Sequence, residues 1–345
     1  MEKSEHGGDI YANTGVWSDF SVNTNPLGMP KEVKRALIAR VDEFARYPDT
    51  KCRKLREAIA QYENIPADWI LCGNGAADLI YRLCYAIKPR KALIFTPAFS
   101  EYERALEQVG CLVTRRILTN ENAFAFPNDA DRFLAPDIDC VFLCNPNNPT
   151  GRLIPSGAIE RVLNRARQNG AKVVVDECFL DFTRGAPCKE YLREMPNLAL
   201  LKAFTKMYAI AGLRLGYLIC ADIKLTEKVK TAGDCWNVSV PAQIAGVAAL
   251  TRADWADKTR RFIRRERAFL TKGLSELKIA VFPSDANFLL LRCEKPLFEP
   301  LLKKGILIRR CENFIGLDDT YYRIGVKTRP ENTRLLEALK EILNG

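Results

Sequence analysis

A lysine and an arginine eight residues apart form the stretch with the clearest chemical potential. Lys206 follows an apolar segment, 198–201, and Arg214 lies between Gly212 and Gly216. A lysine walled in by apolar residues is partly desolvated, which lowers its pKa and makes its amine a nucleophile. An arginine fixed between two glycines, which let backbone approach closely, suits a phosphate. A Schiff-base amine beside a phosphate anchor is what pyridoxal phosphate requires, although a surface loop with solvated charges fits this stretch equally well.

Polar or glycine-rich segments also follow other apolar runs. Residues 73–77 follow 69–72 and open an apolar helix, so free N–H groups and the helix dipole would point at an anion. By itself such a cradle is a weak signal, since a plain tight turn has the same composition. Phe99 follows the predicted strand 92–95 and could either stack on a flat ring or belong to the core.

Two more such segments lie further along the chain. The loop 145–151 follows 140–144, and its two X-Pro bonds and one glycine predict a rigid loop that can hold a cis peptide bond. The buried strand 173–175 ends in Asp176 and Glu177. Parallel strands flanked by helices bind ligands at their carboxyl edge. Several such ends meeting at one edge favour a ligand site more strongly than any single motif does.

The elements that would position these groups alternate between strand and helix up to about residue 240. This order predicts an α/β fold, with a large cofactor-binding domain over 31–240. Residues 1–30 are rich in Gly, Asn and Pro, and we expect them to form an arm associated with the small domain and the active site. Helical sequence over 240–274 and later short strands predict a smaller α+β domain over 241–345.

The net charge of +10, from 52 Lys and Arg against 42 Asp and Glu, favours anionic partners, either nucleic acid or small phosphorylated molecules. The densest basic segment, 260–267, reads as part of a helix with an apolar stripe of Trp255, Phe262 and Phe269. A solvated helix face explains these arginines better than a nucleic-acid surface, because no helix-turn-helix, zinc-finger or RNA-binding aromatic motif accompanies them. We therefore expect no nucleic-acid partner.

The twelve cysteines are scattered, no Cys-x-x-Cys pair occurs, and the chain has a single histidine. We therefore expect that the protein has no metal site, that its thiols are reduced and that it is cytoplasmic. Apolar runs are strand-sized and the N-terminus is polar, so we expect neither a membrane span nor a signal peptide.

Taken together, these residues resemble the fold type I pyridoxal-phosphate-dependent aminotransferase superfamily over nearly the whole chain. The strongest marks are 145–151, Asp176 and 206–214, in that order and spacing. The resemblance implies a three-layer fold with a mostly parallel sheet, bound pyridoxal phosphate and a homodimer.

The resemblance also implies a role for each candidate residue. Lys206 would form the Schiff base with the cofactor. Asp176 would pair with the protonated pyridine nitrogen, so that the ring can absorb the electron pair released at Cα. Asn148 would bond the 3-oxygen of the ring and Phe99 would stack on it. The phosphate would be held by Gly75, Ala76, Ala77, Thr205 and Arg214, with Tyr47 reaching in from a second subunit.

Within that superfamily the chain resembles the histidinol-phosphate aminotransferase branch and, inside it, the L-threonine-O-3-phosphate decarboxylases of cobalamin synthesis. The segments that carry this likeness are 6–8, 19–28, 97–102, 305–309 and 311–317. Aminotransferases of the branch usually place a tyrosine three residues after the ring aspartate, where this chain has Phe179, and losing that bond fits the decarboxylases. The segment between Asp9 and Asp19 is shorter than in typical decarboxylases of this kind.

The resemblance therefore implies a carboxy-lyase that converts L-threonine O-3-phosphate into (R)-1-aminopropan-2-yl phosphate. The substrate would be gripped by His6, Asn23, Arg309 and Arg323. An aminotransferase acting on histidinol phosphate or a related amino acid is the main alternative. A non-catalytic protein that binds pyridoxal phosphate or nucleic acid is a third.

Overall fold

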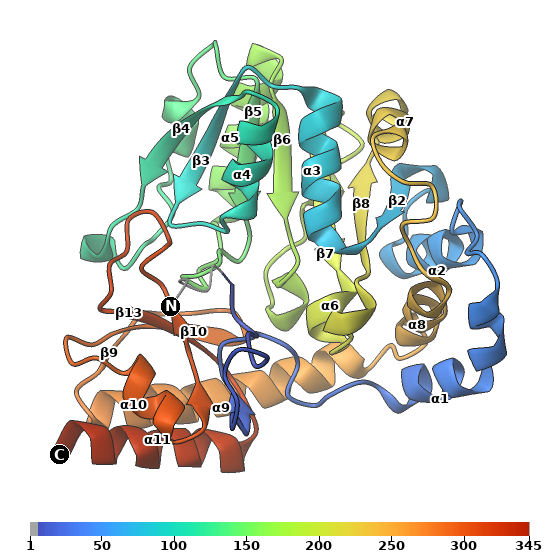
Figure 1. Ribbon diagram of the computed structural model, residues 1–345. Helices are drawn as coiled ribbons and strands as arrows, with labels where there is room; N and C mark the ends of the chain where they lie inside the picture. The colour runs from blue at the N-terminus through green and yellow to red at the C-terminus, as the bar shows by residue number, and fades with distance from the viewer. Residues whose placement is uncertain (1–5, 345) are drawn as a thin grey trace.

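The computed structural model describes residues 6–344, and its largest element is a seven-stranded sheet (Figure 1). The strand order is β2-β8-β7-β6-β5-β3-β4, and β8 runs antiparallel to both of its neighbours while the other pairs are parallel. The strands are β2 (Ile70–Gly73), β3 (Lys91–Thr96), β4 (Leu112–Ile117), β5 (Cys140–Cys144), β6 (Lys172–Asp176), β7 (Leu198–Ala203) and β8 (Gly216–Cys220). The inner strands are buried on both faces, which explains their continuous apolar sequences.

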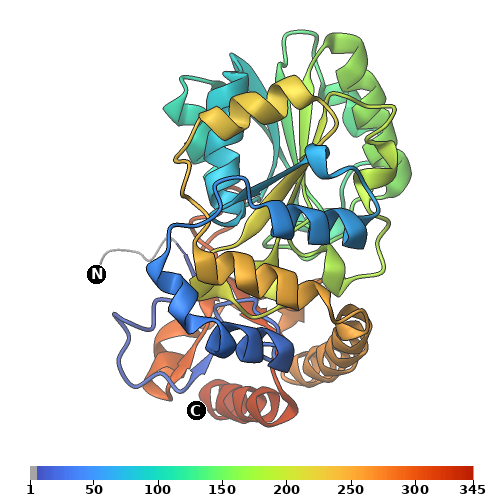
Figure 2. The same cartoon turned by 90° about the vertical axis from the view of Figure 1, so that its right-hand side faces the viewer.

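Helices cover both faces of this sheet, as Figure 2 shows. Those around it are α3 (Gly75–Ile87), α4 (Glu101–Gln108), α5 (Ser156–Asn169) and α7 (Ile223–Thr231). Gly170 ends α5 with a left-handed φ of 72°. The α/β three-layer prediction is confirmed. A separate group of helices, α1 (Lys31–Ala39), α2 (Arg53–Glu63) and α8 (Val240–Leu250), packs together beside the sheet.

A smaller antiparallel sheet lies below the large one in Figure 1, with strand order β12-β13-β10-β9. Its strands are β9 (Ala280–Val281), β10 (Phe288–Arg292), β12 (Arg309–Arg310) and β13 (Tyr321–Gly325). The helices beside it are α9 (Trp255–Glu276), α10 (Phe298–Lys303) and α11 (Arg329–Asn344). In the N-terminal arm, β1 (Ser18–Asp19) pairs in parallel with β11 (Ile306–Leu307), so the arm joins the C-terminal part of the fold. The domain boundaries remain a prediction.

The apolar stripe predicted for α9 is partly wrong. Phe262 and Phe269 are only half-buried, and the buried row is Trp255, Thr259, Ile263, Glu266, Leu270 and Leu274. A spacing of seven residues drifts around a straight helix, whereas steps of three and four stay on one face. Glu266 is tolerated inside because Arg329 Nε donates to it over 2.8 Å.

Across residues 6–344, the structure contains no helix with the length and apolar character needed to cross a membrane.

Candidate active site

The carboxyl ends of β3, β5 and β6, the turn after β7, the arm and the small sheet surround a cavity of about 570 Å³. Most of the predicted site residues line it, namely His6, Asn23, Ala76, Ala77, Phe99, Asn148, Asp176, Thr205, Lys206, Arg214, Arg309 and Arg323. Gly75 lies beside it against Arg214, whereas Tyr47 lies outside. The structure therefore brings together segments that the sequence placed at one sheet edge.

Two buried lysines lie four residues apart, and their surroundings are opposite. Burial lowers the pKa of Lys206, and the positive charge of Arg214 lowers it further. Burial also opposes the charge of Lys202, but the carboxylates of Asp181 and Glu63 outweigh it and raise the pKa of that lysine. Lys202 Nζ lies 2.8 Å from Glu63 Oε1. Lys206 is thus the amine prepared to act as a nucleophile, while Lys202 is a paired cation.

The arm holds the turn that carries Lys206, which forms the short helix α6 (Phe204–Met207). The backbone N–H of Asn25 donates to Lys206 O over 2.9 Å, and its side-chain Nδ2 donates to Met207 O over 2.8 Å. Asn25 is 3% exposed, so these bonds are shielded from water. The sequence indicated an Asn-rich arm but gave no sign that Asn25 fixes the lysine turn.

The anion cradle forms where α3 begins against the turn of Arg214. Gly75 has a φ of +85°, and a Cβ there would lie 2.5 Å from Arg214 Nη2. A Cβ at Gly216 would lie 2.7 Å from the amide nitrogen of Ala76, so this glycine lets the strand approach the cradle. The expectation that both glycines around Arg214 serve close approach is wrong for Gly212, which has open space around its Cβ position.

Asp176 is held by two donors at the end of β6. Its Oδ2 accepts from the Tyr102 hydroxyl over 2.7 Å, and its Oδ1 accepts from the backbone N–H of Cys178 over 2.9 Å. Burial raises the pKa of Tyr102 well above its ordinary value, and the charge of Asp176 raises it further, so the phenol remains a neutral donor. Sequence reasoning missed Tyr102, because only the fold shows which way its hydroxyl points.

Asn148 and Arg323 meet across the cavity. Arg323 Nη1 donates to Asn148 Oδ1 over 2.5 Å, and Nη2 donates to Ser21 O over 2.8 Å. With its oxygen engaged, Asn148 can offer its amide N–H groups to a ligand oxygen. The predicted cis peptide in its loop is confirmed at Asn145–Pro146 and at Asn148–Pro149.

Two polar atoms near the substrate side are buried without a hydrogen-bond partner within residues 6–344. They are Arg323 Nε and Asn23 Oδ1. Burial lowers the pKa of Arg323 to about 10. Buried polar atoms normally have partners, so this pair marks a place where a bound molecule would complete the hydrogen bonding.

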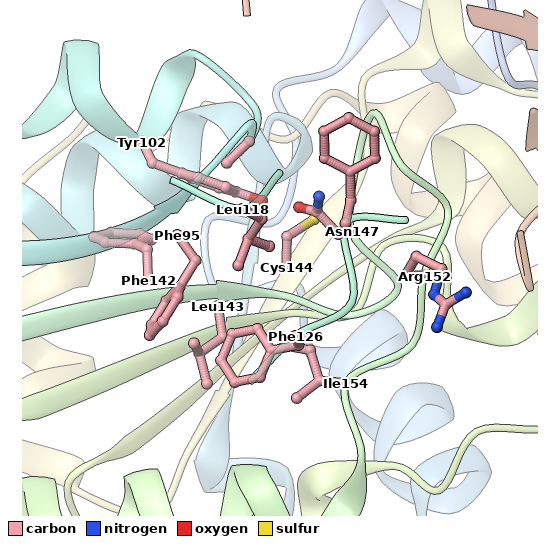
Figure 3. Close-up of a pocket in the computed structure, with 12 residues that line it drawn as sticks. Phe95, Tyr102, Leu118, Phe126, Phe142, Leu143, Cys144, Asn147, Arg152 and Ile154 are labelled. Carbon is pink, nitrogen blue, oxygen red and sulfur yellow. The ribbon is translucent and has the colours of Figure 1, made fainter. Parts of the chain in front are cut away.

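A small apolar chamber, drawn in Figure 3, lies behind the site and supports it. Its volume is about 20 Å³, room for little more than one water molecule. Tyr102 stacks on Phe142 at a ring-centroid distance of 5.2 Å, and Cys144 and Asn147 complete that side. This packing fixes the Tyr102 ring from behind while its hydroxyl reaches Asp176.

A family model, "Aminotransferase class I and II", matches residues 16–339. This chain belongs to the class I and II aminotransferase family. Pyridoxal phosphate is the cofactor that this membership implies, as the sequence predicted. The cavity of this family member fits that group: the α3 cradle with Arg214 suits a phosphate, Asp176 suits a pyridinium nitrogen, and the Lys206 amine suits an aldehyde.

Three known proteins show how close the likeness is. The chain is 40% identical to a threonine-phosphate decarboxylase of Salmonella typhimurium, over 99% of this chain and 97% of that protein. The crystal structure of the histidinol-phosphate aminotransferase from Clostridium acetobutylicum superposes with a TM-score of 0.88 at 32% identity, covering 95% and 99% of the two chains. The crystal structure of L-threonine-O-3-phosphate decarboxylase from Porphyromonas gingivalis superposes with a TM-score of 0.82 at 27% sequence identity. The match covers 96% of this chain and 99% of that one.

Phe179 lines the cavity of this aminotransferase-family chain three residues after Asp176. Its ring packs edge-on against Phe288 at 5.0 Å. A phenyl ring offers no hydrogen bond to a ligand oxygen, unlike the tyrosine usual at this position in aminotransferases of the branch.

Proposed function

We propose that this chain is a threonine-phosphate decarboxylase, which converts L-threonine O-3-phosphate into (R)-1-aminopropan-2-yl phosphate and carbon dioxide for the cobalamin side chain. The observation that carries the proposal is the set of cationic and polar groups on the substrate side of the cavity, His6, Asn23, Arg309 and Arg323. A substrate that carries both a carboxylate and a phosphate needs more positive charge in its binding site than a substrate with a single carboxylate. The 40% identity to a threonine-phosphate decarboxylase over nearly the full chain supports the same choice.

Each group of cavity residues has a separate role in this proposed reaction. Bound pyridoxal phosphate supplies a ring that stabilises negative charge at Cα. Asp176 holds a proton on the ring nitrogen, and Arg214 with the α3 cradle anchors the phosphate. Arg309 and Arg323 would bind the anionic groups of the substrate and so set which bond at Cα is placed to break. After carbon dioxide leaves, Lys206 Nζ returns a proton to Cα.

Transamination of histidinol phosphate or a related amino acid is the second candidate. The TM-score of 0.88 with the aminotransferase from Clostridium acetobutylicum favours it. In that reaction Lys206 would remove the Cα proton instead of delivering one. The two reactions need nearly the same residues and differ in which bond lies perpendicular to the ring.

One assay separates the two candidates. The purified protein is incubated with pyridoxal phosphate and carboxyl-labelled threonine phosphate, and released labelled carbon dioxide is counted. Decarboxylation gives one carbon dioxide for each aminopropanol phosphate formed. Absence of release, together with amino transfer from histidinol phosphate to 2-oxoglutarate, would overturn the proposal in favour of the aminotransferase.

The proposed enzyme is a homodimer in which Tyr47 reaches the phosphate of the neighbouring subunit. Tyr47 is 82% exposed and lies against Trp236, with ring centroids 5.1 Å apart. Large apolar side chains at Ile38, Val41 and Phe44 are exposed on the same segment. An exposed apolar group of this kind fits a protein interface, and most such interfaces in oligomers are symmetric. The scattered cysteines favour a reducing, cytoplasmic setting.

A further inference from the structure

Glu101 lies in the first turn of α4, on the wall of the cavity, with a side chain that is only 11% exposed. Its Oε1 lies 3.0 Å from His6 Nε2, across 95 residues of sequence. Its Oε2 accepts from the Tyr81 hydroxyl over 2.7 Å, and Arg104 Nη1 lies 3.4 Å from Oε1. Tyr81 and Arg104 therefore hold this carboxylate in place, while His6 comes to it from the arm.

The arm is anchored on two sides of the cavity. On the small-sheet side, Arg323 Nη2 on β13 donates to Ser21 O over 2.8 Å, and within the arm the backbone N–H of Gly8 donates to Ser21 Oγ over 2.7 Å. A Cβ on Gly7 would clash with the carbonyl oxygen of Ser21, so this segment sits close against it. On the large-sheet side, the contact between His6 and Glu101 is the second anchor. The arm thus spans the cavity between the two sheets.

A histidine held in this way has a defined orientation. The hydrogen bond at one ring nitrogen fixes which way the other nitrogen faces. With Nε2 directed at Glu101, the opposite edge of the His6 ring faces away from that carboxylate, and His6 lines the cavity. The ring also lies 6.0 Å from Phe99, the residue predicted to stack on the cofactor, so it is close to the reacting part of the cavity.

We propose that Glu101 is a positioning residue for substrate recognition, which holds His6 over the cavity so that it binds the phosphate of the substrate. This inference rests on the proposed function, because it takes a phosphorylated amino acid as the ligand. Glu101 acts through His6 and does not touch the substrate. It therefore favours a phosphorylated amino acid over the same amino acid without phosphate.

The test is a double-mutant cycle with Glu101→Gln and His6→Ala in the holoenzyme. Dissociation constants for L-threonine O-3-phosphate and for L-threonine are measured from the absorbance change of the bound cofactor. Each single variant weakens binding of the phosphorylated ligand about tenfold, the effect of one charge-assisted hydrogen bond, and changes L-threonine binding little. KM for the phosphorylated substrate rises more than kcat falls. The double variant binds no more weakly than His6→Ala, since Glu101 acts through that ring.

Glu103→Gln is the matched control, because Glu103 lies two residues after Glu101 on α4 and pairs with Arg115 on β4 instead of His6. That variant keeps wild-type affinity for both ligands. The proposal is overturned if Glu101→Gln weakens the binding of both ligands equally. It is also overturned if Glu101→Gln weakens binding of the phosphorylated ligand as much in the His6→Ala protein as in the wild type. Failure of wild-type protein to release carbon dioxide would refute the proposed function alone. The Glu101 proposal is then decided by the same cycle with histidinol phosphate and histidinol.

Discussion

Tyr102 donates its hydroxyl to Asp176 Oδ2 over 2.7 Å, from a fully buried position between Phe142 and Phe99. A carboxylate that faces a ring nitrogen must be both ionised and correctly turned. The Tyr102 hydroxyl and the Cys178 N–H provide one donor for each of its oxygens. The carboxylate proposed to face the cofactor ring is therefore oriented by one side-chain hydroxyl and one backbone N–H.

Tyr102→Phe tests this orientation, because it removes the hydroxyl and keeps the ring packing. We expect kcat to fall about tenfold, since a buried hydrogen bond to a charged group is worth roughly 1.5–3 kcal/mol. Asp176→Asn should cost far more, because it removes the charge itself. Steady-state rates and the absorbance spectrum of the bound cofactor measure both effects. Unchanged kcat in Tyr102→Phe would show that Cys178 N–H suffices.

The two buried lysines give a matched test of the Schiff-base assignment. Lys206→Arg keeps the charge but removes the nucleophilic amine, so the borohydride-reducible chromophore should disappear. Lys202→Arg keeps the cation that Glu63 and Asp181 require, and should retain the chromophore. Mass spectrometry of the reduced protein locates the modified lysine. A chromophore that survives in Lys206→Arg would show that another amine holds the cofactor.

Sequence reasoning located the groups whose positions follow from the chain direction of strands. Asp176 ends one buried strand and Lys206 follows its parallel neighbour, and parallel neighbours end at one edge, so their convergence could be predicted. The antiparallel β8 brings Arg214, just before its first residue, to the same edge. The fold class followed from the same alternation of elements.

The residues that hold these site groups in position could not be predicted from the direction of the strands. Asn25 reaches Met207 across 182 residues, and Tyr102 reaches Asp176 across 74. Such contacts depend on tertiary packing, which local patterns do not encode. Likewise Gly212 and Gly216 look alike in sequence, but only Gly216 faces backbone at close range.

These two glycines make a matched pair for the phosphate cradle. Gly216→Ala would place a Cβ 2.7 Å from Ala76 N and 2.8 Å from Gly75 C, so the backbone there must shift. Overpacking of this kind typically costs about 1–3 kcal/mol, and we expect cofactor affinity to fall at least about tenfold. Gly212→Ala enters open space and should bind normally. Titration of the apoenzyme with pyridoxal phosphate compares the two, and equal affinities would contradict the assignment of the cradle.

Glu63 makes the fold sensitive to acid. Burial opposes its ionisation, but Lys202 outweighs burial and, with a 2.6 Å bond from Tyr217, lowers the pKa of Glu63 to about 2. A depressed carboxyl pKa stabilises the fold above the unfolded pKa, and this contribution is lost as the pH falls from about 4.5 to 2. It is worth on the order of 3 kcal/mol.

Urea unfolding measured between pH 2 and 7 tests this contribution of Glu63 to the stability of the fold. Glu63→Gln should be less stable at neutral pH and should lose much of the acid dependence in that window. Glu107→Gln, at an exposed position on α4, is the control and should follow the wild type. Parallel curves for wild type and Glu63→Gln below pH 4.5 would show that other carboxyl groups control acid unfolding.

Mixed dimers test whether Tyr47 serves the neighbouring subunit. A heterodimer of one Tyr47→Ala subunit and one Lys206→Ala subunit is isolated with two different affinity tags. If Tyr47 reaches across the interface, one site combines an intact Lys206 with an intact Tyr47 from the partner, and the dimer has about half of the wild-type activity. If Tyr47 serves its own subunit, both sites are damaged and activity stays at the level of the weaker homodimers. The large exposure of Tyr47 and its place outside its own cavity lead us to expect the first result.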